Sequence, residues 1–307
     1  MSARDRLRRS LLYVPGNMPG MLQNIPVFEA DGVMIDLEDA VPLAEKDAAR
    51  LLAASFLGTV REREREIFVR INPLDTKYAD ADLREVLPAR PDGIRLPKAD
   101  TPEVVERLDT QLTEAEERLG LAIGTFTIIP SIESAVGILN VVATAAASPR
   151  IVALAFGAED YTAAMEIQRT RTGEELQDAR SRVVWAAKAA GVQAIDTVFS
   201  DANDMEGLRH ETELVKRLGF TGKSLVNPRQ IEVVHEVFRP KRQEIDEALE
   251  IMEAIKAARE MGTGVISLRG RMVDAPVVKR AARTLRTAVA FGMLEYELTD
   301  EVIHGKE

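Results

Sequence analysis

Short apolar runs alternate with helical patterns along the first three quarters of the chain, and this alternation constrains the fold most strongly. Each run is closed by Gly, Pro or polar residues, which is typical of a short β-strand. The runs end at residues 15, 39, 73, 100, 134, 160, 201 and 228. Eight strands alternating with helices predict an α/β protein built on a (β/α)₈ TIM barrel. A doubly wound open sheet is the alternative, but it usually has fewer strands, and no GxGxxG follows the first run.

The segments between the runs have the spacing of amphipathic helices. The clearest covers residues 101–120, where we expect Thr101 as N-cap and Pro102 at the first helical position. The other expected helices cover residues 44–58, 135–148, 173–191 and 204–220.

The last part of the chain does not continue the alternation. Residues 241–260 are charged and helical in pattern, residues 261–276 form a Gly-rich connector, and residues 277–293 predict a last helix. We therefore expect a barrel domain of residues 1–235 and a C-terminal helical extension of residues 236–307.

Composition narrows the class of protein and its partners. The 307 residues carry a formal net charge of −10, whereas nucleic acid and anionic membranes require a basic footprint, so neither is expected as a partner. The chain has no Cys, which excludes disulfides, thiolate metal sites and thiol nucleophiles. Its 3 His are scattered, so a histidine-built metal site is not expected.

The N-terminus argues for a cytoplasmic location. Residues 1–10 are basic, but the apolar run that follows, "LLYV", is too short for the core of a signal peptide. No segment approaches the roughly 20 apolar residues that a transmembrane helix needs.

Polar and charged residues gather where the predicted strands end, which is where barrel enzymes place their chemistry. The stretch "VMIDLEDAV" places three acids, Asp36, Glu38 and Asp39, in an otherwise apolar segment. This arrangement needs an explanation, because unpaired buried carboxylates are costly. A shared polar site at the barrel mouth explains these acids. The other strand-end residues are Arg70, Asn72, Arg95, Lys98, Glu133, Glu159, Asp160, Asp196, Asp201 and Asn227.

Several of these residues suggest particular roles. Arg70 is suited to clamp a substrate carboxylate, because its planar fork can bind both oxygens. Glu133 and Asp160 follow neighbouring strands, and two carboxylates without His or Cys suit a hard cation such as Mg²⁺, held partly by substrate and water. Each also has a structural alternative, since these acids could pair with basic neighbours.

Three further residues leave two interpretations open. Asp39 could belong to the site or only to the turn after its strand. Glu38 could take part in the chemistry or form a structural ion pair with Arg70 or Lys98. Lys98 could form a Schiff base, but with so many acids nearby it is better suited to balance their charge.

A set of motifs in these segments resembles the citrate lyase β subunit family, within a wider group of malyl-CoA lyase-like thioester lyases and aldolases. The wider group is indicated by "DLEDAV", "VRIN", "IES" and "GAEDY". The β subunit is indicated by "SDAND", "GKSLVNPRQ" and "RGRMVDAPV". The resemblance runs in order from about residue 8 to about residue 290.

The resemblance implies a Mg²⁺-dependent carbon–carbon lyase that splits citryl thioester into oxaloacetate and acetyl thioester. The family's metal ligands fall on Glu133 and Asp160, its substrate-carboxylate arginine on Arg70, and an acid placed in a neighbouring subunit's site on Asp274. Glu133 would also contact substrate, and Asp274 or Glu38 would move the proton. Locally, Asp274 before Ala275 and Pro276 is also typical of an ordinary helix N-cap.

The resemblance also implies partners. It favours a homo-oligomer, a trimer or hexamer, whose sites are completed between subunits. The thioester is carried by acyl carrier protein or by CoA, and a carrier-protein substrate would bring other citrate lyase subunits.

Three alternatives remain at the level of sequence. One is a stand-alone malyl-CoA or citramalyl-CoA type lyase or synthase. Another is a metal-dependent aldolase acting on a free 2-oxo acid, which would not require a thioester. The third is a non-catalytic structural subunit, although such a subunit has no need of an acid cluster at the barrel mouth.

Overall fold

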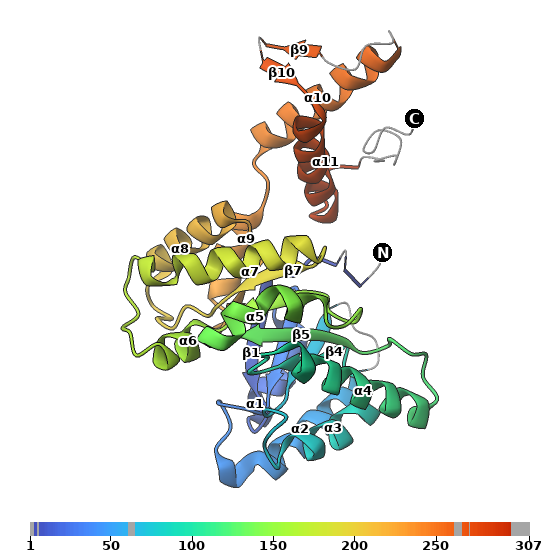
Figure 1. Ribbon diagram of the computed structural model, residues 1–307, viewed down its shortest axis with the longest axis vertical. Helices are drawn as coiled ribbons and strands as arrows, with labels where there is room; N and C mark the ends of the chain where they lie inside the picture. Colours follow the sequence, from blue (N-terminus) through green and yellow to red (C-terminus); the bar gives the residue numbers. More distant parts are fainter. Residues whose placement is uncertain (1–2, 5, 61–64, 261–265, 270, 296–307) are drawn as a thin grey trace. The chain divides into compact units, whose positions relative to one another are not determined.

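The centre of the protein is a closed barrel of eight parallel strands (Figure 1). The computed structural model describes residues 3–4, 6–60, 65–260, 266–269 and 271–295. The strands are β1 (Ser10–Pro15), β2 (Gly32–Asp36), β3 (Glu66–Arg70), β4 (Gly93–Leu96), β5 (Thr127–Ile132), β6 (Ala153–Phe156), β7 (Gln193–Asp196) and β8 (Gly222–Leu225). Each strand pairs with the next, and β1 pairs with β8 to close the barrel. The predicted (β/α)₈ barrel is confirmed.

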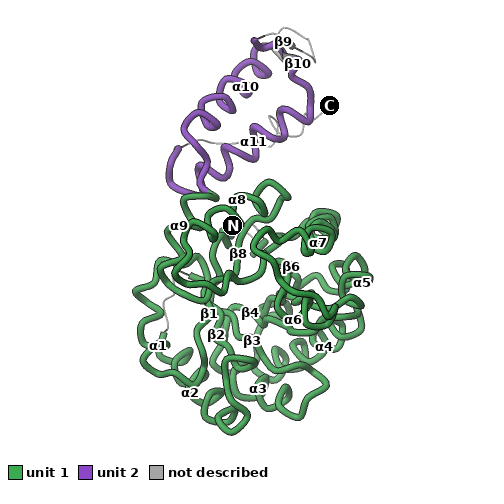
Figure 2. Tube along the Cα trace, turned by 90° about the vertical axis from the view of Figure 1, so that its left-hand side faces the viewer, with its two compact units in different colours: residues 1–238 green, residues 239–307 purple. Residues whose placement is uncertain are grey.

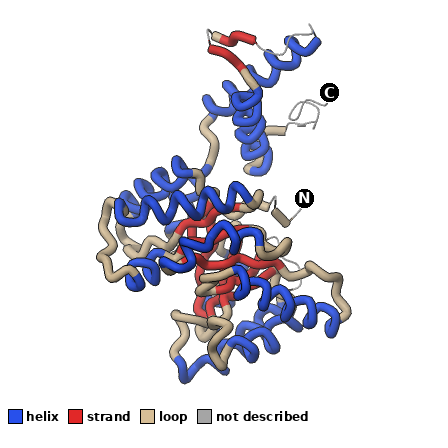
Figure 3. The backbone as a smooth tube through the Cα atoms, in the orientation of Figure 1, coloured by secondary structure: helices blue, strands red, loops and turns tan. Residues whose placement is uncertain are grey.

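Helices cover the outside of the strands (Figure 3). They are α1 (Pro19–Gln23), α2 (Lys46–Thr59), α3 (Ala79–Val86), α4 (Pro102–Leu119), α5 (Ala135–Ala146), α6 (Ala158–Ala164), α7 (Gln177–Ala189), α8 (Met205–Leu218) and α9 (Gln230–Phe238). Short 3₁₀ turns lie at Ile25–Val27, Leu43–Glu45, Leu87–Ala89 and Glu174–Leu176. The helices expected between the strands are confirmed. Thr101 occupies the N-cap position of α4, but its side chain makes no capping hydrogen bond.

The barrel interior is filled by apolar side chains, most of them from alternate strand positions. Its buried cluster consists of Leu11, Met34, Phe68, Ile129, Val152, Ala153, Ala155 and Ile195. Burying a large apolar side chain of this kind contributes roughly 1.5–3 kcal/mol, so this plug holds the strands together below the mouth. The polar residues at the mouth of the barrel therefore lie on a layer of buried apolar side chains.

All strands after β1 end two to five residues earlier than the sequence pattern indicates. After β4, Lys98 adopts a left-handed conformation, with φ of 50°. After β6, Gly157 is the N-cap of α6, so Asp160 lies in the first turn of that helix. Glu38, Lys98, Glu133 and Asp160 are consequently held by loops and helix starts just beyond the strands, which is the carboxyl-end rim of the barrel.

The chain divides into two compact units, residues 1–238 and 239–307 (Figure 2). The boundary expected between residues 235 and 236 falls inside α9, which continues to Phe238 and packs on β1 and β8. None of the described helices combines the length and the apolar character needed to span a membrane.

The second unit is a helical hairpin with a small sheet. It contains α10 (Arg242–Glu260), β9 (Ile266–Leu268), β10 (Arg271–Val273) and α11 (Ala275–Ala290). β9 and β10 form an antiparallel pair inside the segment expected to be a connector, of which residues 261–265 and 270 lie outside the described residues. The helices pack through a buried cluster that includes Ile245, Met252, Val278 and Leu285.

Candidate active site

Arg70 is the centre of the polar rim. Its Nε and Nη2 donate to the two carboxylate oxygens of Asp36 at 2.7 and 2.6 Å. Asp36 is the register partner of Arg70 across β2 and β3, and it is buried. Burial alone would raise the pKa of Asp36, but the charge and hydrogen bonds of Arg70 hold this pKa below its usual value. The Arg70 guanidinium, predicted to bind a substrate carboxylate, thus already uses two of its nitrogens to bind the carboxylate of Asp36.

The segment after β2 is folded around the same carboxylate. Asp36 accepts hydrogen bonds from the backbone N–H groups of Glu38 and Ala40, at 2.9 and 3.1 Å. From α2, Lys46 donates to the carbonyls of Leu37 and Glu38, both at 2.7 Å. Asp36 therefore stabilises the turn that presents Glu38, which accounts for this acid in an apolar strand.

Glu38 lies beside Arg70 in a buried position. Its Oε2 is 2.8 Å from Arg70 Nη1, within ion-pair distance, yet it is not aligned for a hydrogen bond and has no hydrogen-bond partner among the described residues. Burial raises the pKa of Glu38 to about 8, despite the opposing charge of Arg70. Asp39 is more distant, 3.4 Å from Arg70 Nη1, and largely exposed. The contact with Arg70 considered for Glu38 is present, and the raised pKa lets the Glu38 carboxyl carry a proton near neutral pH.

Glu133 and Asp160 form the acidic part of the rim. Glu133 is buried, and its Oε1 accepts a hydrogen bond from the backbone N–H of Lys98 at 2.7 Å. A Cβ on Gly157 would lie 2.7 Å from Glu133 Oε2, so only a glycine allows this close approach at the start of α6. Burial and the charge of Asp160 raise the pKa of Glu133 to about 7. Burial and the charge of Asp39 raise the pKa of Asp160.

These carboxylates fit a hard divalent cation. Asp160 makes Glu133 harder to ionise, and a positive charge shared by the two acids would favour their ionised forms. Carboxylate oxygens are also the ligands that Mg²⁺ prefers. No set of three or more acidic or histidine ligands converges within the described part of the chain. Glu133 and Asp160 would therefore leave most coordination positions to substrate and water.

Tyr13 was missed by sequence reasoning, and Arg95 received no role from it. Arg95 is the register partner of Arg70 on β4. The guanidinium groups of Arg70 and Arg95 both lie over the ring of Tyr13, on β1, at 5.0 and 5.6 Å from its centroid. Burial raises the pKa of Tyr13, so the ring stays neutral. The register of neighbouring strands would have identified these two residues, but a single sequence does not contain that register.

Asp196 and Asn72 do not join the rim, contrary to expectation. Asp196 bonds to Arg180 at 2.9 Å and to Lys223 at 2.6 Å, in a fully buried network between the strands and the outer helices. Its neighbour Ile195 faces the barrel interior, so Asp196 faces outward. Asn72 is buried and donates to Asp82 at 2.6 Å.

Two other strand-end residues serve their local turns. The Oδ1 atoms of Asp201 and Asn227 accept hydrogen bonds from the backbone N–H groups of Asn203 and Arg229, at 2.9 and 3.0 Å.

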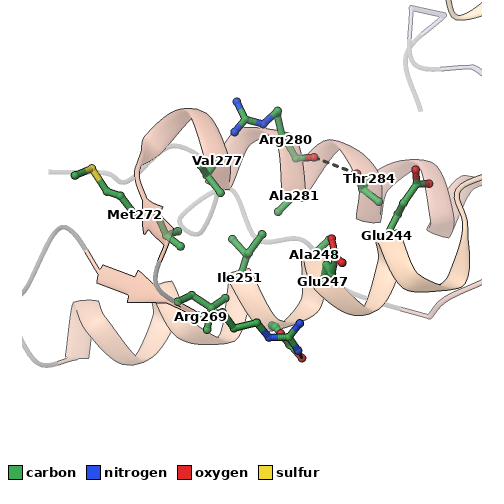
Figure 4. A pocket seen from close by; sticks show the side chains of 13 residues that line it. Glu244, Glu247, Ala248, Ile251, Arg269, Met272, Val277, Arg280, Ala281 and Thr284 are labelled. Atoms are coloured by element: carbon green, nitrogen blue, oxygen red, sulfur yellow. Dashed lines mark hydrogen bonds and ion pairs between the residues drawn. The ribbon is translucent and has the colours of Figure 1, made fainter. Parts of the chain in front are cut away.

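Asp274 lies in the second unit, where it caps α11. Its Oδ1 accepts a hydrogen bond from the backbone N–H of Val277 at 3.1 Å. This unit also contains a groove of about 590 Å³ between α10 and α11 (Figure 4), lined by Glu244, Glu247, Glu250, Arg269 and Arg280 among others. Asp274 is not part of its lining. The local contacts of Asp274 are thus those of a helix cap.

An arginine fork, an acidic turn and two carboxylates at the carboxyl ends of the strands define a barrel protein suited to a hard cation and an anionic substrate. The chain belongs to the HpcH/HpaI aldolase/citrate lyase family, whose pattern matches residues 9–228. It is accordingly a carbon–carbon lyase.

Individual relatives cover nearly the whole chain. Citrate lyase subunit beta of Leuconostoc mesenteroides subsp. cremoris is 46% identical, over 95% of this chain and 97% of its own length. The mitochondrial citramalyl-CoA lyase of Mus musculus is 35% identical, over 92% and 87%. The crystal structure of the protein CitE from Mycobacterium tuberculosis, in complex with magnesium, acetoacetate and coenzyme A, is 29% identical with a TM-score of 0.77, over 93% of this chain and 99% of that chain.

Proposed function

We propose that this chain is a magnesium-dependent lyase that cleaves citryl thioester to oxaloacetate and acetyl thioester, the reaction of a citrate lyase β subunit. The observation that carries the proposal is the 46% identity to a citrate lyase subunit beta over 95% of the chain, which includes both units. The rim of Arg70, Glu133 and Asp160 has the parts that such a cleavage needs.

Glu133 and Asp160 are the residues proposed to hold Mg²⁺. The relative from Mycobacterium tuberculosis binds magnesium, and the donor set here fits it. When bound there, the cation would supply Lewis acidity to the hydroxyl that must lose its proton. Glu133, fixed by the N–H of Lys98, keeps its other oxygen for this purpose and for contact with substrate.

The remaining work falls to residues of the chain. Arg70 binds and orients a substrate carboxylate, which holds the bond to be broken in a fixed position. A carboxylate accepts the hydroxyl proton, the C–C bond breaks with its electron pair on the thioester side, and a proton returned to that carbon gives acetyl thioester. Glu38 is one candidate for these proton transfers, because its Oε2 has no hydrogen-bond partner among the described residues.

Asp274 is the second candidate for proton transfer. The proposal places the Asp274 of one copy in the site of a neighbouring copy, in a homo-oligomer that is a trimer or hexamer. The C-terminal extension would then contribute to a neighbour's site. The thioester is carried by acyl carrier protein or CoA, other citrate lyase subunits are partners, and the reaction takes place in the cytoplasm.

Turnover of citryl-carrier protein, citryl-CoA and malyl-CoA, measured side by side with and without Mg²⁺, tests the proposal. We expect citryl thioester to be the best substrate and activity to disappear when Mg²⁺ is chelated. Cleavage of malyl-CoA without cleavage of either citryl thioester would overturn it.

A lyase for citramalyl-CoA is the second candidate function. It is supported by the citramalyl-CoA lyase that is 35% identical over 92% of this chain. Including citramalyl-CoA in the same assay separates the two functions. A non-catalytic subunit would cleave none of these thioesters.

A further inference from the structure

Arg95 differs from the other buried arginines of the described chain. Four of them pair with a buried acid: Arg8 with Glu66, Arg50 with Asp82, Arg150 with Glu116 and Arg180 with Asp196. Arg95 is only 3% exposed, yet no carboxylate of a described residue forms an ion pair with it. A buried charge without a counter-charge is costly, so this position needs an explanation.

The contacts of Arg95 are with neutral groups. Its Nε donates to Ser131 Oγ at 2.8 Å, its Nη1 to Ser224 Oγ at 3.4 Å, and its guanidinium faces the Tyr13 ring. Its Nη2 has no hydrogen-bond partner among the described residues. The two hydroxyls fix the plane of the guanidinium without neutralising it, which leaves a preoriented positive charge.

Arg95 stands beside the residue proposed to hold the first substrate carboxylate. Arg70 and Arg95 are paired across β3 and β4, and both guanidinium groups lie over the neutral Tyr13 ring. Arg70 already has Asp36, Glu38 and Asp39 around it. The charge of Arg95 opposes the rise that burial and Asp160 cause in the pKa of Glu133, but the two residues make no ion pair. Among the described residues, the rim thus contains one guanidinium with ion-pair partners, Arg70, and one without, Arg95.

The proposed substrate has a matching second charge. Cleavage of citryl thioester yields oxaloacetate, which is pyruvate with a carboxylate added to its methyl group. Citramalyl and malyl thioesters yield pyruvate and glyoxylate, which lack that carboxylate. An enzyme that selects citryl thioester therefore needs a second positively charged side chain, at a fixed place beside Arg70.

We propose that Arg95, held by Ser131, Ser224 and Tyr13, binds the second carboxylate of the substrate and determines specificity for citryl over citramalyl and malyl thioesters. This inference rests on the proposed function, because it concerns the substrate of the same site. A buried charge made for a ligand carboxylate also discriminates strongly against ligands that leave it unpaired.

The test compares Arg95→Gln, which removes the charge, with Arg95→Lys, which keeps the charge but loses the fork. Arg182→Gln, on the outer helix α7, is the control, since its side chain is 44% exposed and pairs with Asp178. For each protein, calorimetry measures the affinity for oxaloacetate and for pyruvate in the presence of Mg²⁺. Steady-state assays measure kcat/KM for citryl-CoA and citramalyl-CoA.

We expect Arg95→Gln to lower the affinity for oxaloacetate and the kcat/KM for citryl-CoA by roughly 100- to 1000-fold, with pyruvate and citramalyl-CoA near their wild-type values. Arg95→Lys should bind oxaloacetate at least about 10-fold more weakly than wild type. If Arg95→Gln does not fold, as judged by its thermal unfolding, Arg95→Lys decides. The control should match wild type throughout.

An unchanged oxaloacetate-to-pyruvate ratio in the folded variants would overturn the inference and leave Arg95 as a packing residue of the barrel. This failure differs from failure of the proposed function. In the latter, the wild-type protein itself would not cleave citryl-CoA or citryl-carrier protein, while the binding ratio would still report on Arg95.

Discussion

Arg70 has a structural role and a proposed substrate-binding role, and a substitution can separate the two. It supports the turn after β2 through Asp36, and it is proposed to hold a substrate carboxylate. The opposite end of the barrel offers a matched pair, because Arg9 bonds to Asp31 with the same fork, at 2.7 and 2.6 Å. Comparing the two arginines separates stability from catalysis.

Arg70→Lys should remain folded but lose most activity, because Lys supplies the charge without the planar fork. A charged hydrogen bond lost in the transition state costs roughly 2–4 kcal/mol, or about 30- to 1000-fold in rate. Arg9→Lys should lower the melting temperature about as much as Arg70→Lys does, but it should leave kcat unchanged. Near wild-type turnover by Arg70→Lys would remove Arg70 from the chemistry.

Glu133 and Asp160 are expected to hold one divalent cation. Glu133→Ala and Asp160→Ala should each weaken Mg²⁺ binding severely, as measured by calorimetry, since only two protein carboxylates are proposed to hold the ion. Glu159→Ala is the matched control, because Glu159 precedes Asp160 on α6 but pairs with Arg169 instead. Unchanged Mg²⁺ affinity in both site variants would refute the metal assignment.

At the scale of elements, a buried charge network ties the last strands to the outer helices. Glu211 on α8 forms ion pairs with Lys223 of β8 at 2.6 Å and with Arg180 of α7 at 3.1 Å. Burial would raise the pKa of Glu211, but the charges of Lys223 and Arg180 lower it from 4.5 to about 2. The network therefore stabilises the folded state only while Glu211 is ionised.

The sign of the pH dependence follows from that shift. A pKa depressed in the folded state contributes stability that is complete above pH 4.5 and is lost as the pH falls toward 2, roughly 3 kcal/mol in all. Urea unfolding of wild type should show this loss. Glu211→Gln should be less stable at neutral pH, and the difference from wild type should narrow below pH 4.5. A constant difference at every pH would contradict this account.

At the scale of the whole molecule, the question is what the second unit adds to the barrel. Asp274 caps α11 in its own chain, and it is proposed to serve a neighbour's site as an acid. The two roles require different chemistry. A serine preserves the cap but removes the carboxylate, whereas an alanine removes both and should cost about 1 kcal/mol of stability.

Asp274→Ser should therefore keep wild-type stability and be nearly inactive if the acid takes part in catalysis. Mixed with Arg70→Lys under verified subunit exchange, it should regain activity, because some interfaces then pair an intact barrel with an intact extension. A fully active Asp274→Ser would show that the residue is only a cap. A mixture that stays inactive would exclude a site shared between copies.

Much of this architecture follows from local pattern. The period of the apolar runs determined eight strands, the helical spacing determined the helices between them, and motif residues pointed to Arg70, Glu133 and Asp160. These signals survive in a single sequence because strand and helix preferences act over a few neighbouring residues.

Tertiary structure alone decided which face of each strand points inward. Strands of a parallel barrel are buried on both faces, so the apolar pattern does not distinguish the interior from the helix-covered side. Closure and register turned Asp196 outward to Arg180 and Lys223, and placed Arg95 inward beside Tyr13. An uncompensated arginine becomes visible only when the distances to all neighbouring carboxylates are known, because those neighbours come from strands far apart in the chain.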